Sequence, residues 1–412
     1  MSKSSSSVIH ASLLVTGTCI GGGMLALPLW IAQYGFAGAA AGLTICWLFM
    51  TLTALMLLRA NSWLKLGTHF VNTAEQILGP FAKWIAWLVY AFIAYASLVA
   101  YVAGGSQIIL DLFWGLGAGD FAEDFTEIIF TLACGVILAF GAKILAKLNS
   151  FFFALMMAMF VAILVLGFPL VEFHDLTGFK VAGLSNTFPL FLTSFSFQMI
   201  VPSIRNYLGG DDQKCRQSIW IGMSLTLAIY LAWMLFVYLV MPLEGPYSLM
   251  ESLRKGEPVT TALIQVVSSK WLLFWIAFFS LFAIITSFLG ISLGLYEFLE
   301  DSLHLKKAKA KVWLLALVLI PPLMGAVSFE GVFLKALDLT GGLGDTVING
   351  LLPISMMLAG YFSLARTSRL SLKPDMIAIS RWGWMRLLLC TLLATTVLFA
   401  ELKRVLWGLL WG

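Results

Sequence analysis

Charged residues are scarce in this sequence. Asp, Glu, Lys and Arg make up 11% of its 412 residues, whereas hydrophobic residues make up 60%. A soluble globular domain carries about twice that charged share. The composition therefore excludes an ordinary water-soluble fold and indicates a protein embedded in a lipid bilayer.

Cysteines and catalytic motifs are also sparse. The five cysteines are scattered singly, which predicts neither a disulfide framework nor a metal site. The chain contains no H-E-x-x-H pattern, nucleophile elbow, Walker loop or pair of haem ligands, so neither an enzyme nor a bound cofactor is expected. The net charge of +4 requires no nucleic-acid partner, because basic loops beside anionic lipid account for it.

Apolar runs of about 20 residues, each long enough to cross a bilayer as a helix, recur along the chain. They predict an all-α polytopic membrane protein with eleven transmembrane helices and one membrane domain over 1–412. The first five form one unit over 8–169, the next five a second unit over 185–364, and the eleventh stands alone. The predicted helices cover 8–33, 36–58, 84–114, 125–142, 150–169, 185–204, 217–241, 271–299, 312–328, 338–364 and 383–402.

The distribution of Lys and Arg predicts the orientation of these helices. With the N-terminus inside and strict alternation, eighteen basic residues fall at cytoplasmic ends and seven at outer ends. Cytoplasmic loops of membrane proteins carry the excess of positive charge. We therefore expect the N-terminus to be cytoplasmic.

The first predicted helix contains three successive glycines at its middle, Gly21, Gly22 and Gly23, and Pro28 follows them. Glycine weakens a helix. Proline removes the backbone donor that would bond the carbonyl four residues earlier, here that of Met24. The pattern predicts a helix that is interrupted at mid-membrane.

The sixth predicted helix has a polar centre at 193–198, followed by Pro202, which should free the carbonyl of Gln198. Unpaired backbone groups persist in hydrocarbon only where protein, water or a ligand satisfies them. Interrupted helices at corresponding places in two halves are typical of a transporter's binding site. Since each half holds five helices, the two halves should be inverted relative to each other.

The helix ends suggest which ligand would bind. Free amides near Gly22 and Gly23 suit a carboxylate, and carbonyls near Thr18, Cys19, Ser194 and Phe195 suit an ammonium group. The alternative is that the glycines, serines and aromatic residues merely pack or bond between helices. The predicted substrate-binding residues are Thr18, Gly21, Gly22, Gly23, Met24, Tyr101, Ser194, Phe195, Ser196, Phe197 and Gln198.

Ionisable and hydroxyl groups inside the membrane are candidates for ion coupling. They are Lys147, Ser287, Asp338 and Asp345. Positive-inside anchoring explains Lys147 equally well, and the two acids could simply face external water. The sequence leaves proton and sodium coupling open and predicts no oligomeric state.

Three motifs carry a family resemblance: Gly17-Thr18-Cys19-Ile20-Gly21-Gly22-Gly23-Met24-Leu25-Ala26-Leu27-Pro28, Thr193-Ser194-Phe195-Ser196-Phe197-Gln198, and Val201-Pro202-Ser203-Ile204-Arg205. Gly341-Gly342-Leu343-Gly344 and Ser287-Phe288-Leu289-Gly290 support them. The chain resembles the bacterial hydroxy and aromatic amino acid permeases of the amino acid/polyamine/organocation superfamily, most closely the tyrosine-specific branch. Ser196 departs from the glycine that is common in that family.

The resemblance implies a leucine-transporter-like fold of five plus five inverted helices, with helices one and six broken. It also implies proton symport of an aromatic amino acid, with tyrosine favoured, across the bacterial cytoplasmic (inner) membrane. Transport of tryptophan or of serine and threonine, and sodium coupling, are the alternatives within this class. A channel would need a filter built by symmetry or by rings of charge. A membrane sensor is the other alternative, although the sequence contains no soluble signalling domain.

Overall fold

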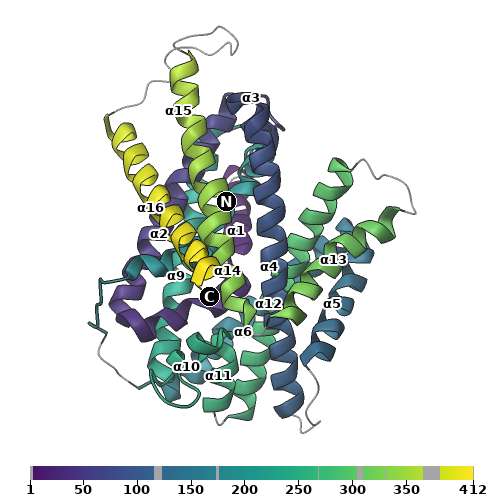
Figure 1. The fold of residues 1–412 in the computed structure, drawn as a ribbon, viewed down its shortest axis with the longest axis vertical. Coiled ribbons are helices and arrows are strands. Elements are labelled where there is room, and N and C mark those ends of the chain that lie inside the picture. The colour runs from purple at the N-terminus through teal and green to yellow at the C-terminus, as the bar shows by residue number, and fades with distance from the viewer. Residues whose placement is uncertain are drawn as a thin grey trace.

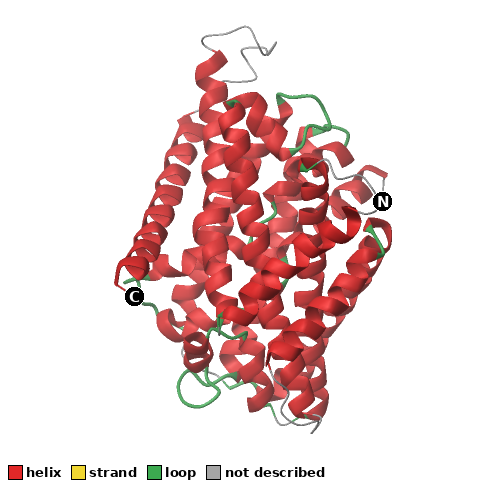
Figure 2. Ribbon diagram, turned by 45° about the vertical axis from the view of Figure 1, so that its right-hand side comes forward, coloured by secondary structure: helices red, strands yellow, loops and turns green. Residues whose placement is uncertain are grey.

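The computed structural model describes residues 3–115, 123–172, 176–267, 269–303, 310–329, 331–364 and 381–411. Across these residues the regular structure is helical throughout (Figure 2), and long helices run along the bundle (Figure 1). Nine apolar helical segments in this part of the chain are long enough to cross a membrane, and Ser7–Cys19 and Phe125–Ala139 are shorter apolar helices. This architecture is consistent with a polytopic membrane protein. Eleven crossings and an inverted repeat stay predictions.

Each predicted span coincides with a helix or with a broken pair of helices, although the observed bounds differ by several residues. Short helices α3 (Phe70–Leu78), α10 (Leu249–Lys255) and α11 (Val259–Val266) lie between them. The long helices are α1 (Lys3–Cys19), α2 (Ile31–Ser62), α4 (Pro80–Gly115), α5 (Glu123–Ala139), α6 (Ala142–Gly167), α9 (Asp212–Val240), α12 (Lys270–Ser302), α13 (Ala310–Ser328) and α16 (Arg381–Trp411).

The first interruption begins at Ile20. α1 ends at Cys19, Gly21 is extended with φ −169° and ψ −151°, and the chain continues as two 3₁₀ turns, η1 (Gly22–Leu25) and η2 (Leu27–Trp30), before α2. Pro28 occupies the first turn of η2, where its missing N–H costs no helical bond. The glycines therefore lie at the break, while Pro28 starts the segment that follows it.

The second interruption has the same form. α7 (Phe188–Ser194) ends in the polar run, Phe197 has φ −148° and ψ −3°, and η5 (Gln198–Ile200) leads into α8 (Val201–Tyr207). Pro202 lies in the first turn of α8. In both helices, proline restarts the helix after the break and is not the place where it opens.

The tenth predicted helix contains a wide turn. α14 (Val332–Leu339) continues into η6 (Thr340–Leu351), a π-helix, and then α15 (Leu352–Leu364). A β-carbon on Gly341 would collide with the carbonyl of Pro189 on α7, and one on Gly344 with Ile93 on α4. The glycines thus allow η6 to pack directly on the interrupted helix α7. π-turns of this kind often mark functional sites.

The two interrupted helices lie in the middle of the bundle. α1 packs on α9, α4 and α6 pack on α12, and η6 is flanked by α7, α4 and α16. Both breaks are therefore surrounded by continuous helices that can supply hydrogen-bond partners.

Two polar groups fix the chain that follows the second interruption, where α8 ends and α9 begins. Arg205 of α8 is buried, and its guanidinium donates to the carbonyls of Asn61 and Leu64 at 3.1 and 3.4 Å. Asp211 caps α9 by accepting from the amides of Lys214 and Gln213 at 3.1 Å. These hydrogen bonds, led by the Lys214 amide, lower the pKa of Asp211. The capping interaction is therefore present near neutral pH and is lost as pH falls through that lowered pKa.

We predict that Gly35→Ala destabilises the protein. Gly35 kinks α2 with φ 72° and ψ 167°, and a β-carbon there would collide with the carbonyl of Gly178. Left-handed strain and the collision together should cost about 2–4 kcal/mol, which would be seen as a lowered midpoint of thermal unfolding in detergent.

Gly209→Ala is the matched control for this substitution. Gly209 has a similar φ of 66°, but no atom lies within 4 Å of the added carbon. Its cost should be the strain alone, about 1–2 kcal/mol. Equal losses for the two variants would contradict a rigid contact between Gly35 and Gly178.

Candidate functional site

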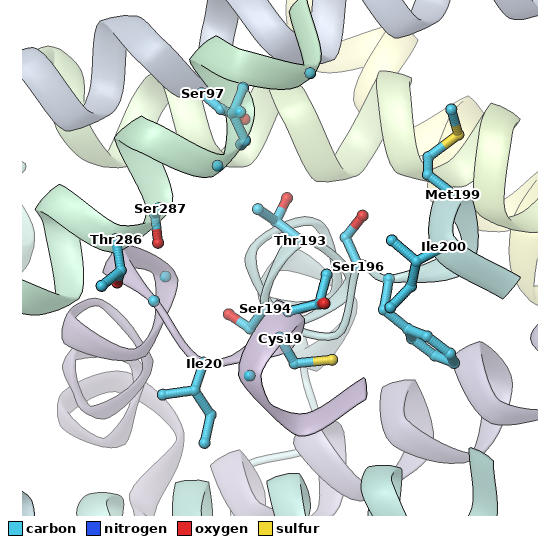
Figure 3. Close-up of a pocket in the computed structure, with 18 of the residues that line it drawn as sticks. Cys19, Ile20, Ser97, Thr193, Ser194, Ser196, Met199, Ile200, Thr286 and Ser287 are labelled. Carbon is cyan, nitrogen blue, oxygen red and sulfur yellow. The ribbon is translucent and has the colours of Figure 1, made fainter. Parts of the chain in front are cut away.

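A cavity of about 690 Å³ lies beside both interruptions. Its volume falls within the roughly 300–1,000 Å³ of small-molecule sites. Figure 3 shows Thr286 and Ser287 of α12 on one side of the cavity and Thr193, Ser194 and Ser196 on another, with Cys19 and Ile20 below them in this view. The lining continues to His10 on α1 and to Asn149 and Ser150 on α6. The cavity thus extends from the breaks toward the N-terminal half of α1.

Seven of the eleven predicted substrate-binding residues lie on this cavity, and four do not. Gly22, Met24, Phe195 and Gln198 are outside its lining. The residues that line it are Thr18, Gly21, Gly23, Tyr101, Ser194, Ser196 and Phe197, together with the coupling candidates Ser287 and Asp345.

The glycine segment is held against α12 and α4. The amide of Gly22 donates to Ser287 Oγ at 3.1 Å. A β-carbon on Gly22 would lie 2.7 Å from Cε1 of Tyr101, and one on Gly21 would collide with Ser287 Oγ. Within the described chain the amide of Gly21 has no acceptor. Glycine is therefore required here for close approach, and it leaves an amide available at the start of η1.

The break also leaves a carbonyl available at the end of α1. In an unbroken helix the amide of Gly22 would bond the carbonyl of Thr18, but it bonds Ser287 instead. Thr18 lines the cavity, and its own hydroxyl donates back to the carbonyl of Leu14 at 2.8 Å. The Thr18 carbonyl, an acceptor, and the Gly21 amide, a donor, thus lie three residues apart along one wall of the cavity.

Tyr230, which was not predicted, joins the two interruptions. From the middle of α9 its buried hydroxyl lies 2.7 Å from the carbonyl of Cys19 and 2.7 Å from that of Ser194. These are two of the carbonyls that were predicted to receive an ammonium group. A phenol has one proton to donate, so it can fully satisfy only one of them at a time. The sequence signal was a tyrosine at mid-helix, far from either interface.

The predicted residues outside the cavity have structural contacts. Phe195 packs on Tyr230, with ring centroids 5.3 Å apart. Gln198 accepts from the amide of Phe197 at 3.0 Å and donates to the carbonyl of Met50 on α2 at 3.2 Å. Met24 is buried in the hydrophobic core. These side chains hold the unwound segments in place without reaching the cavity.

Asp345 forms a polar cluster between η6 and the second interruption. Its Oδ1 accepts from Ser196 Oγ at 2.7 Å and from Asn349 Nδ2 at 2.6 Å. The Asn349 amide also donates to Ser196 Oγ at 2.9 Å. Among the described residues, Asp345 Oδ2 and Asn349 Oδ1 have no partner although both are buried. Asn349 was missed, and its signal was an amide one turn beyond Asp345 in an apolar helix.

The other coupling candidates lie elsewhere. Asp338 pairs with Arg404 of α16 at 3.2 Å, and the same guanidinium bonds the buried Glu401 at 2.7 Å. Lys147 is exposed and is not part of the cavity lining. Of the four candidates, Ser287 and Asp345 are the two that the cavity brings together.

We expect Tyr230→Phe to impair ligand binding as well as stability. Removing the hydroxyl leaves the carbonyls of Cys19 and Ser194 without their donor, and an unsatisfied buried acceptor costs about 1–3 kcal/mol. The two interrupted helices should then lose their common tie. Ligand binding to the purified protein should weaken at least tenfold, and the thermal midpoint should fall.

Tyr95→Phe is the matched control. The Tyr95 hydroxyl donates to the carbonyl of Leu317 at 3.0 Å, a carbonyl whose helical donor is missing because residue 321 is proline. This variant also removes a phenol from an orphaned carbonyl, but neither Tyr95 nor Leu317 lines the cavity. It should lose stability and keep its ligand affinity, and equal loss of affinity in both variants would argue against a specific role for Tyr230.

Comparison with known proteins identifies the family. The model of the tryptophan/tyrosine permease family matches residues 4–371. The chain is 30% identical to the tyrosine-specific transport system 1 of Haemophilus influenzae, with 81% of this chain and 83% of that one covered. It is 28% identical to the tryptophan-specific transport protein of Pseudomonas aeruginosa (81% and 82%) and 26% identical to glutamine transporter 2 of Aliivibrio fischeri (80% and 84%). These relatives are transport proteins and not enzymes, and the resemblance drawn from the glycine and serine motifs is confirmed: the chain belongs to the tryptophan/tyrosine permease family.

Proposed function

We infer that this permease imports an aromatic amino acid, with tyrosine favoured, across the bacterial cytoplasmic membrane by proton symport. The observation that carries this is the glycine interruption on the wall of the cavity, where the Gly21 amide and the Thr18 carbonyl have no partner among the described residues. A backbone N–H donor and a backbone carbonyl acceptor, three residues apart, suit the carboxylate and the ammonium group of a zwitterion. Tyrosine is favoured because a tyrosine-specific transporter is 30% identical over most of its length.

The substrate's carboxylate is proposed to bind at the start of η1. There the amide of Gly21 and the positive end of the turn favour an anion. The hydroxyl of Ser287, already bonded to the amide of Gly22, lies on the same side of the cavity. The ammonium group would turn to the carbonyl of Thr18, since the carbonyls of Cys19 and Ser194 already share the Tyr230 hydroxyl.

The aromatic side chain is proposed to lie against the apolar part of the lining. Phe197, Ile93 and Ile348 contribute side chains from three different elements, and Phe153 contributes one from α6. A ring packed among them would bury its faces, while a hydroxyl on the ring could reach polar groups such as Ser97 or Asn149. This arrangement favours an aromatic substrate over serine.

Transport would proceed by alternating access. The two broken helices, the first and the sixth, would move together with the second and the seventh. These four would rock against the third, fourth, eighth and ninth helices as parts of a five-plus-five inverted repeat. The cavity extends toward the N-terminal half of α1, the side that the Lys and Arg distribution assigns to the cytoplasm. This is the geometry of an inward-facing state.

The proposal is tested by uptake into proteoliposomes of labelled tyrosine, tryptophan, phenylalanine, serine and glutamine. We expect tyrosine to accumulate at least tenfold when the outside is made acidic, with or without sodium, and a protonophore to abolish the accumulation. Liposomes without protein are the control.

Two results would overturn parts of this proposal separately. Uptake that requires sodium and ignores the pH gradient would exclude proton symport. If serine or glutamine is taken up and none of the three aromatic amino acids is, the aromatic substrate is excluded. Glutamine is included because one relative is named as a glutamine transporter.

A further inference from the structure

We propose that Asp345 is the group that binds the transported proton, and that Ser196 passes its change of charge to the interrupted helix α7–α8. This inference rests on the proton symport proposed above and names the residues that perform it.

The first support is the environment of the carboxylate. Asp345 is fully buried, lines the cavity and makes no ion pair within the described chain. Its Oδ1 receives two neutral donors, Ser196 Oγ and Asn349 Nδ2, whereas Oδ2 receives none. A buried carboxylate without a cation is unfavourable when charged. A proton on Oδ2 would remove that cost.

The second support is that no unpaired cation among the described residues packs against this part of η6. Arg404 of α16 is engaged by Asp338 and Glu401. α7 carries no titratable residue, and α2 meets η6 through Phe49 at Gly350. The other titratable groups that the packed elements turn toward this part of η6 are Tyr90 and Tyr101 of α4, on the cavity wall, and Glu401, which packs on Gly342. Glu401 is paired with Arg404, so among these described groups Asp345 is the carboxylate without a cation beside it.

A proton fits this site better than a metal ion does. Asn349 Nδ2, Asp345 Oδ1 and Ser196 Oγ lie within 2.9 Å of one another, and the amide nitrogen donates to both oxygens. One coordination position on each oxygen is therefore already taken by an N–H donor. A proton requires one free lone pair, which Oδ2 provides.

The link to substrate movement runs through Ser196. Its hydroxyl belongs to the unwound run between α7 and η5, and Figure 3 shows it turned away from Cys19. While Asp345 is ionised, this hydrogen bond is charge-assisted and strong. When a proton from external water forms an O–H bond at Oδ2, the carboxyl becomes neutral and the bond from Ser196 weakens. The α7–α8 segment is then freer to move, and release of the proton to cytoplasmic water through the cavity restores the bond.

The test compares Asp345→Asn with Asp338→Asn in proteoliposomes. Two readouts are used: exchange of labelled for unlabelled tyrosine without a gradient, and accumulation driven by an acidic exterior. In Asp345→Asn the ratio of gradient-driven accumulation to exchange should fall at least tenfold below that of wild type, and uptake should no longer acidify a lumenal pH dye. Asp338→Asn, a carboxylate on the same helix, should keep both activities.

The outcomes separate this inference from the proposed function. If wild type accumulates tyrosine with the pH gradient and Asp345→Asn does so too, Asp345 is not the proton site. If wild type itself ignores the gradient, proton symport fails, and the Asp345 proposal fails with it. If Asp345→Asn does not fold, Asp345→Glu takes its place. This variant keeps a carboxylate and should retain gradient-driven uptake. A folded Asp345→Glu protein that has lost gradient-driven uptake would overturn the proposal.

Ser196→Ala tests the positioning role. Loss of the hydroxyl removes a donor to the ionised carboxylate, so the midpoint of the pH dependence of exchange should move to higher pH. A purely structural role would lower the rate without moving the midpoint. An unchanged midpoint would therefore overturn the link between Ser196 and Asp345.

Discussion

A backbone amide or carbonyl left unpaired inside the hydrocarbon layer costs several kcal/mol, so an interrupted helix can exist there only when other groups supply the missing partners. The rest of this structure follows from that constraint. Ser287 bonds the amide of Gly22, Gln198 bonds that of Phe197, and Tyr230 reaches the carbonyls of Cys19 and Ser194. Each partner comes from the side chain of a helical residue. Among the described residues the Gly21 amide and the Thr18 carbonyl receive no such partner, and both residues lie on the cavity.

Close approach is the second requirement of such an arrangement. Ser287 can reach Gly22, and the ring of Tyr101 can lie beside it, because neither Gly21 nor Gly22 carries a β-carbon. The same holds at Gly341, where η6 touches the backbone of α7. Glycine is costly in a helix interior, but at these places it allows contacts on which the hydrogen bonds of the breaks depend. The cost of weakening the helix and the benefit of packing it closely thus fall on the same residues.

The sequence was sufficient to locate the breaks and the part of the cavity wall that they form, because both depend on local composition. Three glycines in one helix and a polar run in another are visible without any knowledge of packing. The role of the prolines was less visible: Pro28 and Pro202 could open a helix or begin one, and the structure has them in first turns. Tyr230 and Asn349 were missed for a different reason. Tyr230 lies 211 residues from Cys19, and Asn349 lies 153 residues from Ser196, so their importance depends on the rotation of one helix against another.

The same long-range packing decides which of the acidic residues can respond to a proton. Asp338 and Asp345 lie on one continuous helical stretch, yet Asp338 shares Arg404 with Glu401 and thereby ties α14 to α16. Asp345 instead meets neutral donors, one of which belongs to the broken segment between α7 and η5. A change of charge at Asp338 would be absorbed by an ion pair between continuous helices. A change of charge at Asp345 acts on backbone that is already unwound, and therefore on the part of the molecule where a small free energy can produce a movement.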